Sequence, residues 1–251
     1  MVMGLARRRL TAILTGAALF LPVAAAAPAA ADDAQASSVA ISIKVSDKVK
    51  EKSGCWYLVW NVTASGLNSS DYYSLGTKVT NTKTNKSVTG YLAVSGGLKN
   101  GENRVRAYVC ASSFKAGPYK AVATVKVSGK RIATATGKTF KVTGKPTVGI
   151  TNGYSYGNDP FYMYGYADPS VDTVGSTVKV YFKKNGASKF TQVATAKVQA
   201  SGKYEVTTSK ITLGVVYVQT VKTTYLSAAT SPKVKIVQQS GSVSPAAVIG
   251  G

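Results

Sequence analysis

The sequence predicts an all-β protein made of two tandem antiparallel β-sandwiches. Apolar and polar residues alternate with period two in short runs, such as residues 41–45 and 119–127, and no long helical period is present. Turn-forming pairs such as Ser128-Gly129 separate the runs at intervals of about ten residues. Apolar residues make up 45% of the chain, which is enough for a packed core. One larger barrel is the alternative architecture for the same pattern.

Residues 1–31 are predicted to be a cleaved secretory signal peptide. Three arginines at 7–9 precede an uncharged apolar stretch, and alanines at 29–31 provide small residues before Asp32. A retained membrane anchor is the alternative, because the uncharged run of residues 10–31 is long enough to span a bilayer. Pro22 and Pro28 favour cleavage. The mature chain has no second apolar stretch of that length, so we expect a secreted, extracellular protein without a transmembrane segment.

The first predicted sandwich covers residues 38–143. Cys55 and Cys110 are the two cysteines of the chain, and in an exported protein they predict one disulfide. The chain-entropy model assigns about 4 kcal/mol to closing a loop of about 55 residues. Strand-like runs lie at 41–45, 56–62, 77–80, 105–109, 119–127 and 140–142.

The second predicted sandwich covers residues 144–238 and begins at the boundary Gly144-Lys145-Pro146. Each half has about 95 to 105 residues, the usual size of one sandwich domain. Asn185-Gly186 between two runs predicts a hairpin. Residues 239–251 carry no charge and are predicted to be a flexible tail. Strand-like runs lie at 161–166, 177–182, 193–198, 204–207, 215–221 and 233–237.

The second half resembles the bacterial immunoglobulin-like domains of secreted and cell-surface proteins. The resemblance is carried by Phe-Tyr-Met-Tyr-Gly at 161–165 with Asp168-Pro169, and by residues 175–184, 190–198 and 201–204. The first half is similar to the single-disulfide sandwich modules of exported Gram-positive proteins. These motifs are turns and core positions, so the resemblance implies two tandem immunoglobulin-like sandwiches and no particular ligand.

The sequence leaves the place of the disulfide open. Tyr108 lies two residues before Cys110, as in the strand of antibody domains that carries the second cysteine. Gly117-Pro118-Tyr119 also fits the start of that strand, and the two registers exclude each other. A disulfide between the sheets is therefore in doubt.

The composition excludes several enzyme classes. The chain has no His, so it forms neither a Ser-His-Asp nor a Cys-His nucleophile and no His-ligated zinc site. Eight acidic residues follow Asp33, and no local motif pairs them as a glycosidase requires. A Ser-Lys dyad stays formally open at Ser112 and Ser176, although neither begins a predicted helix. We expect no enzyme, no cofactor and no metal site.

A cluster of tyrosines is the first candidate binding feature. In a strand, the tyrosines at 162, 164 and 166 share one face, and Phe161, Met163 and Gly165 share the other. If the Phe and Met face is core, the tyrosines form an exposed stripe that can stack on sugar rings or contact a protein. Two alternatives stay open: the tyrosines form the core, or the contact between the two sandwiches covers them. Five tyrosines lie within 13 residues: Tyr154, Tyr156, Tyr162, Tyr164 and Tyr166.

Positive charge is the second candidate feature. The formal charge is +21, and +18 without the three arginines of the leader. A solvated outer face is one interpretation of lysines that alternate with apolar residues, and attraction to a polyanion is the other. Nucleic acid is disfavoured, because no basic recognition helix is present and Arg is scarce. Lysines alternate in this way at Lys120, Lys126, Lys141, Lys179, Lys183, Lys233 and Lys235.

These observations predict a secreted, non-catalytic binding or adhesion module of the bacterial cell envelope. Its strongly basic surface attracts an anionic envelope polymer, and the five tyrosines, together with Lys183 and Lys184, form the candidate binding surface. The alternative is a secreted effector, an inhibitor or a component of an antagonistic toxin, that acts through a specific extracellular protein partner. The sequence does not determine the oligomeric state.

Overall fold

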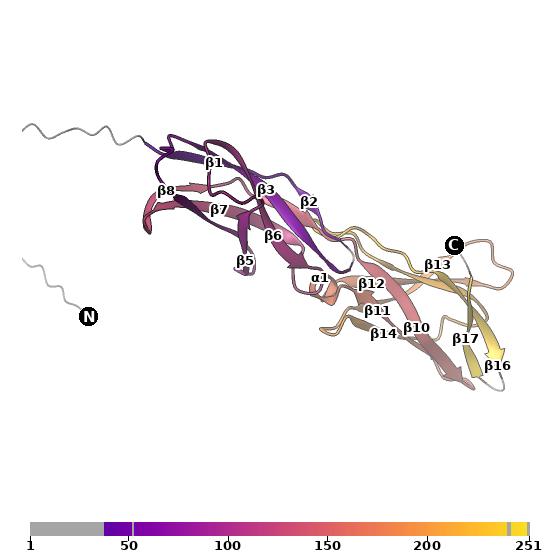
Figure 1. Cartoon of the computed structure of the whole chain (residues 1–251). Coiled ribbons are helices and arrows are strands. Elements are labelled where there is room, and N and C mark those ends of the chain that lie inside the picture. Colours follow the sequence, from indigo (N-terminus) through magenta and orange to yellow (C-terminus); the bar gives the residue numbers. More distant parts are fainter. Residues whose placement is uncertain (1–37, 52, 240–241, 250–251) are drawn as a thin grey trace, which may run out of the picture. The chain divides into compact units, whose positions relative to one another are not determined.

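The computed structural model describes residues 38–51, 53–239 and 242–249 (Figure 1). The predicted signal peptide lies outside the described residues. The prediction of an all-β protein is confirmed, because the described part of the chain contains seventeen strands and a single short helix, α1 (Ser170–Thr173). The strand pairs are antiparallel except for the short parallel pair of β2 with β9.

The first group of strands forms two packed layers. Strands β1, β3 and β6 form one sheet, and β4, β7 and β9 form the other. Strand β5 pairs with β4 at its start and with β6 at its end, so it links the two layers. The strands are β1 (Ala40–Lys44), β2 (Lys48–Val49), β3 (Cys55–Ser65), β4 (Tyr73–Asn81), β5 (Ser87–Leu92), β6 (Gly101–Cys110), β7 (Gly117–Val127), β8 (Lys130–Thr136) and β9 (Phe140–Thr143).

The second group of strands repeats this arrangement. Strands β10, β11 and β14 form one sheet, and β12, β15 and β16 form the other, with β13 beside β12. The strands are β10 (Thr147–Tyr156), β11 (Phe161–Asp168), β12 (Thr177–Lys184), β13 (Thr191–Lys197), β14 (Lys203–Thr208), β15 (Gly214–Thr220), β16 (Lys233–Gln239) and β17 (Ser242–Ile249).

Both groups have an immunoglobulin-like strand order. The first, second and fifth main strands share one sheet, and the third, sixth and seventh share the other. We call these sheet I (β1-β3-β6 and β10-β11-β14) and sheet II (β4-β7-β9 and β12-β15-β16). Their apolar cores are separate, one within residues 148–236 and the others within residues 58–142. Two separate cores exclude the single larger barrel.

The period-two pattern explains which face of each strand is buried. In β6, Val105, Ala107 and Val109 are buried, whereas Arg106 and Tyr108 between them point outward. The predicted turn at Ser128-Gly129 is confirmed, since both residues have positive φ angles, 45° and 80°, and join β7 to β8. Two-residue hairpin turns require this backbone conformation.

Five strands lie outside the runs that the sequence predicted: β2, β5, β8, β10 and β17. No strand was expected at residues 147–156, where glycines interrupt the apolar pattern, yet they form β10. Gly153 faces the core there, because a Cβ atom on it would lie 2.8 Å from the ring of Phe161. The flexible tail expected for residues 239–251 is wrong for residues 242–249, which form β17. This strand pairs with β16 and with the end of β10 and covers the free edge of β16.

Candidate binding surfaces

The tyrosines of β10 and β11 point away from the core. Phe161 and Met163 are buried on the opposite face of β11, with exposures of 1% and 0%. Tyr154, Tyr156 and Tyr166 are exposed, and Tyr162 and Tyr164 are half-buried. Of the three arrangements that the sequence left open, the structure has the exposed stripe, and it has this stripe because the other face carries the core residues.

Four of the five tyrosine rings form a continuous row. Tyr154 lies directly opposite Tyr162 in the β10–β11 pair, and their ring centroids are 5.4 Å apart. Tyr156 continues the row on one side at 5.5 Å from Tyr154, and Tyr164 on the other at 6.2 Å from Tyr162. We call Tyr154, Tyr156, Tyr162, Tyr164 and Tyr166 the tyrosine platform.

A fixed carboxylate lies beside this platform. Glu205 of β14 is opposite Tyr164 and accepts hydrogen bonds from the Tyr162 hydroxyl (2.6 Å), Lys203 Nζ (2.7 Å) and Gln199 Nε2 (2.9 Å). These bonds hold the pKa of Glu205 at about 2, with the Lys203 bond as the largest cause. Lys203 Nζ also lies 4.8 Å from the centre of the Tyr164 ring. The carboxylate is therefore ionised and held in position at neutral pH.

A second aromatic cluster lies on sheet I of the first sandwich, and the sequence analysis missed it. The Arg106 guanidinium is 4.8 Å from the ring centre of Tyr57 and 5.3 Å from that of Tyr91. Tyr57 also lies opposite Tyr108, with ring centroids 5.4 Å apart. All three tyrosines are exposed, by 42% to 59%. We call Tyr57, Tyr91, Tyr108 and Arg106 the Arg106 platform.

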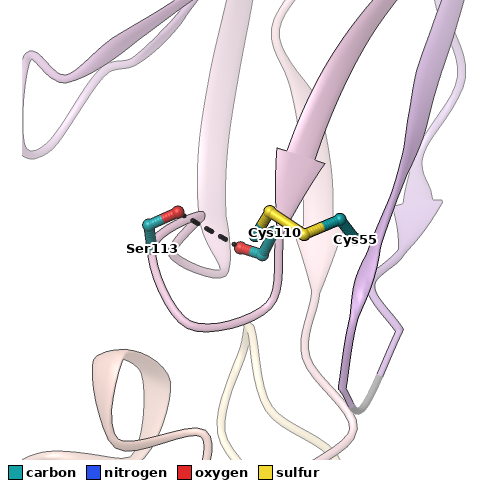
Figure 2. Close-up of a disulfide and its surroundings, with 3 residues drawn as sticks. All are labelled: Cys55, Cys110 and Ser113. Carbon is teal, nitrogen blue, oxygen red and sulfur yellow. Dashed lines mark hydrogen bonds between the residues drawn. A yellow bond between two sulfur atoms is a disulfide. The ribbon is translucent and has the colours of Figure 1, made fainter.

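The disulfide between Cys55 and Cys110 (Figure 2) lies in the strand pair that carries Tyr57 and Tyr108 of this second platform. Cys55 and Cys110 are bonded, as predicted, and lie directly opposite each other on β3 and β6. The bond therefore joins two neighbours of one sheet and does not connect the layers. Ser113 Oγ donates to the Cys110 carbonyl at 3.5 Å in the turn that follows. Tyr57 and Tyr108 are each two residues from a cysteine, and this spacing is the signal that predicts their pairing.

The open question of register is also answered. Strand β7 begins at Gly117, so Gly117-Pro118-Tyr119 starts the sixth main strand, and Cys110 ends the fifth. The buried Tyr119 ring stacks on Phe114 at 4.7 Å. Its burial raises the pKa of the Tyr119 hydroxyl to about 12.

Lysines gather on sheet II. Strands β4, β7, β9, β12, β15 and β16 together hold nine lysines and no acidic residue. Lys183 and Lys184 belong to this group, on β12, so the structure separates them from the strands of the tyrosine platform. Lys183 Nζ lies 5.6 Å from the centre of the Phe190 ring. We call the outward sides of sheet II the lysine faces.

A buried ion pair and a cavity lie where the two sandwiches meet. Lys50 Nζ is 2.6 Å from Asp172 Oδ2, and both side chains are inaccessible to solvent. A cavity of about 570 Å³ is lined by Tyr108 and Phe114 of the first sandwich and by Val171 and Val174 near α1. No group of three or more His, Cys, Asp or Glu side chains that could hold a metal occurs among the described residues. No helix in the described ranges is long and apolar enough to cross a membrane.

Comparisons with known proteins give only distant likenesses. No protein-family model matches the chain, and no curated protein matches it. A chicken interferon gamma receptor alpha chain is 11% identical, with 72% of this chain and 94% of that chain covered and a TM-score of 0.33. The FN1–FN3 domains of chicken CNTN1 are 12% identical, with coverages of 76% and 64% and a TM-score of 0.37.

The BSP domain of a biofilm associated protein is a third similar structure. It is 15% identical, with a TM-score of 0.27, and the match covers 79% of this chain but 29% of that one. Likenesses of this strength carry no conclusion about ligand, partner or activity.

Proposed function

We propose that this protein is a secreted, non-catalytic binding or adhesion module that attaches to the bacterial cell envelope through an anionic polymer. The observation that carries the proposal is the pair of lysine faces, whose strands hold nine lysines and no acidic residue. Lysines that share one side of a sheet add their potentials and attract a polyanion over a long range.

The few acidic residues do not neutralise these faces. Two ion pairs occur among the described residues, Lys50 with Asp172 and Lys203 with Glu205. The first pair is buried, and the second lies beside the tyrosine platform on sheet I. The lysines of sheet II are therefore left without a carboxylate partner and are available to the phosphate or carboxylate groups of an envelope polymer.

Export and the lack of catalysis rest on the sequence and the disulfide. The pattern of residues 1–31 fits a secretory leader, and the Cys55–Cys110 bond fits an oxidising compartment. The absence of His and the scarcity of acids remove the usual general acids and bases.

A secreted effector with a specific protein partner is the second candidate. The Arg106 platform favours it, because exposed tyrosines around an arginine are typical of the residues that dominate protein interfaces. This function requires a partner of fixed stoichiometry and binding that resists salt.

Co-sedimentation of the mature protein with isolated Gram-positive cell walls tests the proposal. We expect pelleting at low salt and release at high salt, because ions screen exposed charges beyond about 10 Å at 0.1 M. A variant with Gln at Lys78, Lys120, Lys126 and Lys141 removes one lysine face, and we expect it to stay in solution. Its matched control carries Gln at four exposed loop lysines, at positions 83, 86, 99 and 138, and has the same net charge.

The control separates a positioned surface from charge in general. If both variants lose wall binding equally, net charge alone acts and the lysine face is not the site. If the wild type does not pellet in either buffer, the envelope proposal fails and a protein partner becomes the leading candidate.

A further inference from the structure

We propose that the two aromatic platforms are stacking sites for the sugar rings of one acidic polysaccharide chain. This inference rests on the proposed function and deepens it, because it names the chemistry of the envelope polymer. The platforms lie on corresponding sheets of the two sandwiches, and each combines exposed tyrosine rings with a cation: Arg106 in the first and Lys203 in the second.

The spacing of the rings suits a chain of pyranose units. Neighbouring strands are about 4.8 Å apart and side chains of one face recur about every 6.8 Å along a strand, so rings on a sheet form an even row. In the tyrosine platform the centroids are 5.4 to 6.2 Å apart. This is close to the length of one pyranose unit, whose apolar C–H face packs on an aromatic ring.

Polar groups at the tyrosine platform suit the hydroxyl groups of a sugar. A carboxylate has about four acceptor positions, and three of those on Glu205 are occupied by Tyr162, Lys203 and Gln199. One position remains for a hydroxyl donor from the ligand. The charges of Lys203 and Glu205 cancel, so this platform takes a neutral, hydroxyl-bearing ring.

The Arg106 platform, unlike the tyrosine platform, carries a net positive charge. Arg106 forms no ion pair within the described residues, and its Nε is buried without a hydrogen-bond partner. Two tyrosine rings hold the guanidinium in place, which leaves a fixed positive charge between stacking surfaces. This platform takes a ring that carries an anionic group. A chain with both neutral and anionic sugar units therefore fits both platforms.

Because the protein has two platforms, we expect its affinity for a polysaccharide to depend strongly on the length of that polysaccharide. A polysaccharide that reaches both platforms gains from effective concentration, whereas a short oligosaccharide occupies one platform at a time. Removing either platform then abolishes the gain, although the other platform is intact.

Binding of the mature protein to long hyaluronan, in which neutral and acidic sugars alternate, tests the inference. We expect Tyr57→Ala and Tyr164→Ala each to weaken binding about 100-fold, since either change removes one of two linked sites. Tyr57→Phe and Tyr164→Phe keep the ring and should bind as the wild type does. Tyr72→Ala is the matched control, because Tyr72 is 78% exposed and belongs to neither platform.

Three further probes separate this inference from the proposed function. Polyglutamate carries charge without rings, and its binding should be unchanged in the Tyr57→Ala and Tyr164→Ala variants. A hyaluronan tetrasaccharide should bind far more weakly than the long chain. Single-stranded DNA should be insensitive to the same changes.

Each contrary result overturns the inference. If folded Tyr57→Ala and Tyr164→Ala proteins bind hyaluronan as the wild type does, the platforms are not sugar sites, while wall binding through the lysine faces still stands. If the tyrosine changes weaken DNA binding and leave hyaluronan binding unaffected, the occupant is a nucleic acid. If the wild-type protein binds neither cell walls nor hyaluronan, both proposals fail together.

Discussion

Lys50 and Asp172 form an ion pair that joins the two sandwiches and is closed to solvent. The ammonium is 2.6 Å from Asp172 Oδ2, outside the angles of a good hydrogen bond to that oxygen, and it also donates to the carbonyl of Phe114. Asp172 Oδ1 accepts the backbone N–H of Ala116 at 2.6 Å. Burial lowers the pKa of Lys50, and the contact with the Asp172 carboxylate opposes that shift.

Removing one partner of this pair is expected to be costly. Asp172→Ala leaves Lys50 buried without a counter-charge, and we expect the free energy of unfolding to fall by about 3–5 kcal/mol. The double variant Lys50→Met, Asp172→Leu removes both charges and should recover most of that loss. Urea denaturation of the three proteins measures both effects. Equal losses in the single and double variants would show that the packing, and not the charge pair, stabilises this contact.

The disulfide should contribute to stability more than to binding. Replacing Cys55 and Cys110 by Ala opens a loop with a sequence separation of 55 residues, and we expect a loss of about 4 kcal/mol. Thermal unfolding with and without a reductant measures it. The reductant should lower the melting temperature of the wild type. The double variant is the control, and its melting temperature should not change. An unchanged melting temperature of the wild type would contradict the prediction.

Glu205 should titrate at unusually low pH. Its pKa is about 2 in the folded protein against 4.5 for the free group, so the stabilisation from its ionised form is present above pH 4.5 and is lost as pH falls towards 2. A carboxyl NMR titration reports this midpoint. Tyr162→Phe removes one donor and should raise the pKa of Glu205, and a midpoint that does not move would show that the Tyr162 bond is absent in solution.

Gly165 should tolerate no side chain. A Cβ atom there would lie 1.9 Å from the carbonyl oxygen of Gly149 and 2.4 Å from the Tyr204 hydroxyl. We expect Gly165→Ala to destabilise the protein by about 3 kcal/mol, because β10 and β11 have to separate locally. Gly149→Ala is the control, since nothing lies within 4 Å of its Cβ position. Similar melting temperatures for the two variants would contradict this packing.

The alternation of residues determined much of this protein from the sequence alone. In β11 the run Phe-Tyr-Met-Tyr-Gly-Tyr requires the tyrosines to share one face, whichever face is buried. The pairing of Cys55 with Cys110 followed from their number and the export signal. The shared face is a local feature, which the period of a strand fixes without knowledge of its neighbours, and the disulfide follows because the chain has two cysteines.

The tertiary structure alone decided which strands became neighbours and therefore which residues work together. Tyr154 meets Tyr162, and Glu205 meets Tyr162, only because β10 and β14 pair on either side of β11. Arg106 of β6 joins Tyr91 of β5 with Tyr57 of β3, and Tyr57 is far from both in the sequence. The contact between Asp172 and Lys50 likewise joins residues that are far apart in the sequence. Pairing between strands that are far apart in sequence depends on the packing of both sheets, and no local pattern of residues contains that information.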